Sequence, residues 1–114
     1  MLTLFGIANC DTVKKAQRWL EQHALDYRLH DYRRDGLDTA LLQKWLKQVD
    51  WSDLLNQRSR TWRELDARLK QDLSKDKAVA LMVDNPTLIK RPVITTKGVF
   101  IIGFNPDQYQ CLLT

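Results

Sequence analysis

Residues 2–31 contain strand-like and helix-like patterns of hydrophobic residues in turn. Residues 2–7 form a short apolar run, which predicts a strand. Over residues 12–24 apolar side chains recur at helical spacing. Residues 25–31 alternate between apolar and polar positions, which predicts a second strand. A strand, a helix and a strand in this order predict a βαβ unit, with parallel strands joined by a right-handed crossover.

The middle of the chain has a helical pattern throughout. A glycine-containing turn over residues 33–36 precedes a helical repeat over 39–49, and Asp38 or Thr39 can cap that helix. The repeat begins an all-helical insertion that covers about residues 38–85.

Residues 51–84 favour several short helices rather than one long helix. The spacing Thr61-x-x-Glu64 predicts a capping box at the start of one of them. Ser74 or Asp76 can cap another that continues to about residue 83.

The β pattern returns near the end of the chain. Residues 92–96 and 99–102 are apolar β runs, and the two-residue connector Lys97-Gly98 predicts a hairpin. Asn105 can cap a short terminal helix with Pro106 in its first turn. The order βαβ, helices, ββα predicts an α/β chain with a thioredoxin-like fold and a helical insertion between its two halves.

Composition narrows the class of protein. The chain has 114 residues, 44% hydrophobic and 28% charged, which predicts one globular domain over 1–114. The net charge of +4 comes without a block of five Lys or Arg, so we expect no nucleic-acid partner. We expect no membrane partner either, because no apolar run approaches about 18 residues. Two cysteines without a secretory signal predict a reducing cytoplasm.

Cys10 lies between the first predicted strand and the first predicted helix. The first N–H groups of a helix have no intrahelical partner and carry partial positive charge, so a thiolate is stabilised there. Cysteine pKa values fall below about 8.5 at such positions, and the basic residues Lys14, Lys15 and Arg18 follow closely. The alternative is a small buried hydrophobic residue. The placement between strand and helix favours a nucleophile.

The remaining candidate residues point to structure rather than chemistry. Cys111 has helix-interior spacing, so we expect a structural role for it. His23 and His30 are separated by a helix-to-strand boundary and make no metal pair with a cysteine. We therefore expect no metal and no permanently bound cofactor.

Four segments resemble one known family: Gly6-Ile7-Ala8-Asn9-Cys10-Asp11-Thr12-Val13-Lys14-Lys15-Ala16, His30-Asp31-Tyr32-Arg33, Asp35-Gly36-Leu37 and Ile89-Lys90-Arg91-Pro92. This is the ArsC/Spx/YffB family of thioredoxin-fold proteins, and the chain resembles its YffB members most closely. The resemblance implies a nucleophilic Cys10 and a cis proline at Pro92 facing it.

The chain departs from the glutaredoxin-linked arsenate reductases of that family. They carry a histidine where this chain has Gly6, and three arginines that hold the oxyanion. The second arginine matches Arg91, the first is displaced to Arg58, and no basic residue stands near 103–104 in place of the third. Arsenate reduction is therefore an alternative rather than the leading expectation.

The Spx branch resembles the chain in a different way. Its members typically carry a redox Cys-x-x-Cys, whereas this chain has Val13 at the second position. The segment Asn56-Gln57-Arg58-Ser59 is closer to Spx than to the arsenate enzymes. A redox adaptor that docks on a larger protein through Arg58, Arg60 and Arg63 is thus a second alternative.

The resemblance favours a monothiol oxidoreductase, a glutathione-dependent thiol reductase with Cys10 as its nucleophile. Arg91 and Pro92 are expected to bind glutathione, the backbone of Arg91 by strand-like pairing and its side chain by holding a carboxylate. Lys14 and Arg58 are further candidates for that binding. Glutathione is then a co-substrate, and the expected partners are small thiols or disulfides and glutaredoxin. We expect a monomer.

Overall fold

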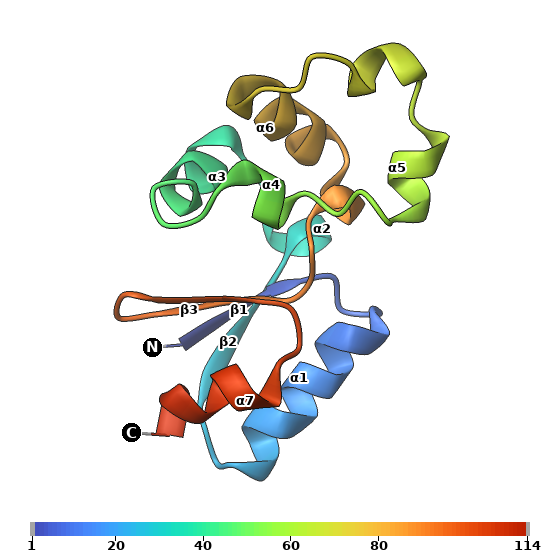
Figure 1. Ribbon diagram of the computed structural model, residues 1–114. Helices are drawn as coiled ribbons and strands as arrows, with labels where there is room; N and C mark the ends of the chain where they lie inside the picture. Colours follow the sequence, from blue (N-terminus) through green and yellow to red (C-terminus); the bar gives the residue numbers. More distant parts are fainter. Residues whose placement is uncertain (1, 114) are drawn as a thin grey trace. The chain divides into compact units, whose positions relative to one another are not determined.

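The computed structural model describes residues 2–113 (Figure 1). The chain divides into two compact units. We call Met1–Gly36 together with Arg91–Thr114 the sheet unit, and Leu37–Lys90 the helical unit. That the two units form one functional domain stays a prediction.

The sheet unit is built on a four-stranded mixed sheet with strand order β2-β1-β3-β4. β1 and β2 are parallel, whereas β1–β3 and β3–β4 are antiparallel. The predicted βαβ unit and the thioredoxin-like order of elements are therefore confirmed. The strands are β1 Leu2–Gly6, β2 Tyr27–Asp31, β3 Val93–Thr96 and β4 Val99–Ile102.

The predicted hairpin joins β3 to β4. Lys97 and Gly98 both have positive φ, 31° and 80°. Two central residues with positive φ match the right-handed twist of the strands that they connect. The register pairs Thr96 with Val99, so the connector has the two residues that the sequence predicts.

Two helices cover one face of this sheet, α1 (Asp11–Gln22) and α7 (Pro106–Tyr109) (Figure 1). The short 3₁₀ helix η3 (Gln110–Leu113) follows α7. Alternate residues of the strands and one stripe of α1 meet in the core, as the two periods of the sequence predict. Its buried members are Leu2, Leu4, Val13, Ala16, Trp19, Leu20, Ile94, Ile101 and Tyr109.

A short helix replaces the turn that the sequence predicts after β2. α2 covers Tyr32–Asp35, and the Asp31 carboxylate caps it by accepting the N–H of Arg33. Gly36 ends the helix with φ of 90°, a conformation that favours glycine. The local capping bond makes one helical turn more stable than an open turn.

The helical unit consists of short helices, as expected for the insertion. Its only pairing of extended backbone within the described residues is the isolated bridge between Leu55 and Ile89. The helices are α3 Thr39–Trp45, α4 Trp51–Leu54, α5 Arg60–Glu64, η1 Ala67–Lys70, α6 Lys75–Asp84 and η2 Pro86–Leu88. No described helix has the length and apolar character needed to span a membrane.

The helix caps settle two alternatives from the sequence and correct one prediction. Asp38 caps α3, and Ser74 caps α6. The capping box at Thr61 is wrong. Ser59 caps α5 by accepting the N–H of Trp62 at 3.1 Å, while the Thr61 hydroxyl lies 2.6 Å from that of Thr87. The Thr61 hydroxyl, which the local pattern predicts to be the cap, instead makes a tertiary contact with Thr87.

Candidate active site

Cys10 stands at the N-cap of α1, at the end of the loop that follows β1. Its backbone N–H donates to the Ile7 carbonyl at 3.0 Å, and its carbonyl accepts the N–H of Lys14 at 3.0 Å. The residue is half-buried, while Ala8 and Asn9 before it are exposed. The thiol is thus held by the backbone and open to solvent on one side.

The surroundings of Cys10 lower the pKa of its thiol. Burial, the largest single effect, raises that pKa, but four contributions together outweigh it. They are the backbone N–H groups of Val13 and Thr12, and both the charge and the hydrogen bonding of Arg91. The helix start therefore stabilises the thiolate as the sequence predicts. The positive charge that acts on it comes from Arg91 rather than from the lysines of α1, which are exposed.

Strand register brings Arg91 to the cysteine. β3 pairs with β1 so that Val93 lies opposite Phe5, which places the residues just before β3 beside the end of β1. The Arg91–Pro92 peptide bond is cis, as the family resemblance implies. The Nε and Nη1 atoms of Arg91 are buried and have no hydrogen-bond partner among the described residues. Buried donors of this kind are rare, because leaving one without a partner costs about 1–3 kcal/mol.

Gly6, the last residue of β1, packs closely against Val13 of α1. A Cβ atom at this position would lie 2.6 Å from Cγ2 of Val13, which is fully buried. No side chain fits at position 6 while Val13 keeps its place. A histidine like that of the glutaredoxin-linked arsenate reductases is therefore excluded here by packing.

The structure places the other predicted site residues on α1, in the helical unit and directly after Arg91. Lys14 is exposed on α1, one helical turn after Cys10. Arg58 is exposed in the helical unit, where its backbone N–H donates to the Asn56 side chain at 3.1 Å. Binding roles for Lys14, Arg58 and Pro92 stay predictions. Cys111 is exposed. The described residues contain no cluster suited to a metal ion.

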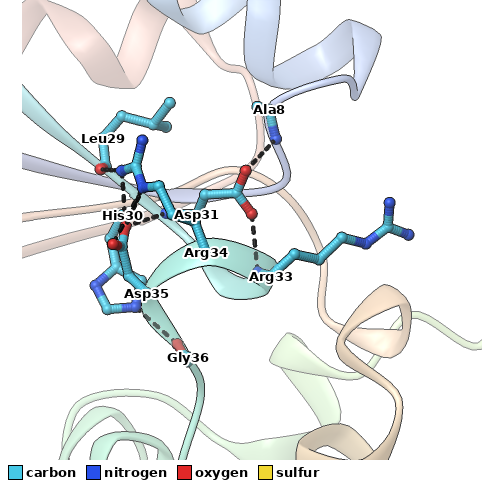
Figure 2. Close-up of polar contacts among 8 residues, drawn as sticks. All are labelled: Ala8, Leu29, His30, Asp31, Arg33, Arg34, Asp35 and Gly36. Carbon is cyan, nitrogen blue, oxygen red and sulfur yellow. Dashed lines mark hydrogen bonds and ion pairs between the residues drawn. The ribbon is translucent and has the colours of Figure 1, made fainter.

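Two residues at the end of β2 were missed by the sequence interpretation. Tyr32 is buried, and this burial raises the pKa of its hydroxyl well above the ordinary range while the Arg91 charge opposes the shift. Asp31 accepts the N–H of Ala8 in the cysteine loop at 3.2 Å (Figure 2). The available signal was the parallel pairing of the first two strands, which puts their carboxyl ends side by side.

Comparison with known proteins decides the family. The sequence profile described as ArsC family matches residues 5–112. The chain belongs to the ArsC family. A solved YffB protein is 41% identical, covers each chain completely and superposes with a TM-score of 0.95. The solution structure of an arsenate reductase (ArsC) related protein of Brucella melitensis is 43% identical, with a TM-score of 0.79 over 96% of this chain and 92% of that one.

A regulator is also among the relatives of this ArsC-family chain. The global transcriptional regulator Spx of Streptococcus pyogenes serotype M3 is 30% identical over 100% of this chain and 86% of its own length. The family and the fold predicted from sequence are thus confirmed, and the fold is that of arsenate reductase-like thiol oxidoreductases.

Proposed function

We propose that this ArsC-family protein is a monothiol oxidoreductase that reduces mixed disulfides with glutathione. The observation that carries the proposal is the Cys10 thiol, whose pKa is lowered by the start of α1 and by Arg91. Position 13, where a dithiol enzyme would carry its second cysteine, is a buried valine. In this proposal an external thiol supplies the second sulfur.

The reaction proceeds in two balanced exchange steps. The Cys10 thiolate attacks the glutathione sulfur of a mixed disulfide, an S–S bond forms between Cys10 and glutathione, and the substrate leaves as a thiolate. A second glutathione thiolate then attacks the glutathione sulfur of that protein-bound disulfide and releases Cys10. Over both steps, the mixed disulfide and one free glutathione thiolate become the substrate thiolate and one glutathione disulfide, and Cys10 is regenerated.

Arg91 supports the choice of an anionic thiol as co-substrate. Its two buried donors, Nε and Nη1, have no hydrogen-bond partner among residues 2–113 and lie on the same guanidinium that acts on the Cys10 thiol. A carboxylate of glutathione can accept two N–H bonds from a guanidinium at once. Lys14 and Arg58 add positive charge for the second carboxylate in this proposal.

Arsenate is the weaker substrate in this proposal. The packing of Gly6 against Val13 leaves no place for a histidine before the nucleophile, and no basic residue stands at 103–104. Of the three arginines that the family resemblance implies for arsenate reductases, Arg91 matches the second, Arg58 is displaced from the first, and the third is absent.

The test is a direct comparison of two substrates. Reduction of a small glutathione mixed disulfide is measured with glutathione, glutathione reductase and NADPH, and arsenate reduction is measured with the same mixture plus glutaredoxin. We expect mixed-disulfide reduction that depends on Cys10, and arsenate turnover far below it. Arsenate turnover that equals or exceeds disulfide reduction would contradict the substrate order. Two inactive assays, together with capture of RNA polymerase by the intact protein, would replace the enzyme with an adaptor.

A further inference from the structure

Asp31 joins the cysteine loop to the second strand. The parallel ladder between β1 and β2 ends at the pair Gly6 and Asp31, and the chain of β1 then turns into the loop that leads to Cys10. Asp31 Oδ2 accepts the N–H of Ala8 at 3.2 Å, so its side chain continues the pairing one step beyond the ladder (Figure 2).

The same carboxylate is fixed on its other side. Asp31 Oδ1 accepts the N–H of Arg33 at 2.8 Å and thereby caps α2. The backbone N–H of Asp31 donates to Asp35 Oδ2 at 3.0 Å, and Asp35 forms an ion pair with Arg34 at 2.7 Å. Figure 2 shows these contacts side by side. Each carboxylate oxygen of Asp31 thus serves a different backbone N–H group.

The loop between Ile7 and Cys10 has few other supports. Its internal bond runs from the Cys10 N–H to the Ile7 carbonyl. Within the described part of the chain, the Asn9 N–H makes no hydrogen bond that would join the loop to a strand. The Ala8–Asp31 hydrogen bond therefore fixes the position of the loop relative to β2. Ala8 lies two residues before Cys10, the proposed nucleophile.

The position of this loop matters for the thiol. The backbone N–H groups of Thr12 and Val13 act on the Cys10 sulfur only while Cys10 stays in line with the first turn of α1. We propose that Asp31 is a positioning residue for Cys10, whose carboxylate holds the Ala8 end of the loop so that the thiolate meets these N–H groups. The inference rests on the proposed role of Cys10 as the reactive thiol.

An Asp31 substitution removes both a negative charge and a hydrogen-bond acceptor, and these two losses do not change the pKa of Cys10 in the same direction. Loss of a negative charge cannot by itself raise the pKa of a thiol, because a carboxylate opposes a nearby thiolate. Loss of position raises that pKa, because the helix N–H groups no longer meet the sulfur. The other charged groups beside Cys10 are Arg91 before β3 and Asp11 and Lys14 on α1, and the substitutions leave all three in place.

The experiment measures the rate of Cys10 alkylation by iodoacetamide against pH, in a Cys111→Ser background so that a single thiol reports. Asp31→Asn leaves one acceptor oxygen for two N–H groups, and Asp31→Ser can cap α2 but is too short to serve both. We expect both to raise the apparent pKa by roughly half a unit or more, about a threefold loss of thiolate at pH values below the pKa. An unchanged or lowered pKa would overturn the inference.

The matched controls are Asp38→Asn and Asp38→Ser. Asp38 also caps a helix, α3, by accepting the N–H of Leu41 at 2.8 Å, but it belongs to the helical unit. We expect these variants to leave the Cys10 titration unchanged. If they raise it as much as the Asp31 variants do, loss of a helix cap explains both results and Asp31 has no special place.

A second measurement needs no substitution. Amide hydrogen exchange in the unmodified protein compares Ala8 with Asn9, neighbours in the same exposed loop. We expect the Ala8 N–H to exchange on the order of tenfold more slowly, because it donates to a carboxylate. Equal exchange rates at Ala8 and Asn9 would contradict the claim that the Ala8–Asp31 hydrogen bond holds the loop. This readout also separates the two proposals, since it stands whether or not Cys10 reduces a disulfide.

Discussion

The sheet unit and the helical unit place their functional candidates by different means. In the sheet unit, Cys10 and Arg91 come together because β1 lies between β2 and β3 in a fixed register. In the helical unit, most polar contacts are local: Asp38, Ser59 and Ser74 each cap the helix that follows directly.

This difference separates geometry from charge. Two helix N–H groups and one guanidinium stabilise the Cys10 thiolate. These contacts act only when the donors lie at hydrogen-bonding distance from the sulfur. Exposed arginines such as Arg58 and Arg63 are solvated and act over longer distances. Substitutions in the sheet unit should therefore change the reactivity of the thiol, and substitutions in the helical unit should change binding.

The largest effect is expected at the nucleophile. Cys10→Ser should lower the rate of glutathione-dependent disulfide reduction to the background rate. The nucleophile is a thiolate, and a serine hydroxyl cannot form one. Cys10 is half-buried and packs against the core, and serine is close to cysteine in size, so circular dichroism and thermal unfolding should stay close to those of the unmodified protein. Cys111→Ser is the matched control and should keep full activity. Activity that survives in Cys10→Ser would refute the mechanism.

The elements with strong local signals were predictable from sequence. The two-residue Lys97-Gly98 connector and the apolar stripe of α1 each determine an element without help from distant residues. The cap of α5 was not predictable in this way. Ser59 and Thr61 both suit a cap, and the choice depends on Thr87, a residue 26 positions away.

In the candidate site, too, features that depend on local sequence were predictable, and features that depend on distant residues were not. The helix start predicted an activated Cys10, but it also suggested Lys14 and Lys15 as the basic neighbours. The charge that acts on the thiol belongs to Arg91, and only the family resemblance pointed to it before the strand register was known. Asp31 was missed because its contact with Ala8 joins residues 23 positions apart.

The next largest effect tests how tightly the sheet unit is packed beneath the site. Gly6→Ala places a methyl group against Val13, and we expect it to lower the free energy of unfolding by about 1–3 kcal/mol. Val13→Ala alone should also destabilise the protein, because it leaves a cavity. The double variant should lose less than the sum of the two, measured by urea unfolding. Simple additivity would show that the two positions do not compete for space.

A smaller effect is expected at Arg91. Arg91→Ala should raise the pKa of Cys10, since the guanidinium favours the thiolate, and should weaken glutathione binding. Arg91→Lys should recover part of the pKa effect but less of the binding, because an ammonium keeps the charge and loses the two-pronged geometry. Alkylation rates against pH and glutathione titration by calorimetry measure the two effects. If neither changes, Arg91 has no part in the site.

The smallest effect is expected in the helical unit. Arg58→Ala should weaken glutathione binding by a few-fold at low salt, and this loss should fade as salt is added, since an exposed charge is screened. The Cys10 titration should not move. A shift in that titration as large as the one in Arg91→Ala would break the distinction between the two units.

The most direct measurement is the apparent pKa of Cys10 in the unmodified site, from iodoacetamide alkylation of the Cys111→Ser protein across pH. A lowered pKa means that the thiolate, and with it the rate, persists to lower pH than for an ordinary cysteine and falls only as pH drops through the lowered value. We predict a midpoint clearly below about 8.5. A midpoint near 8.5 or above would contradict the claim that the start of α1 and Arg91 make Cys10 a nucleophile.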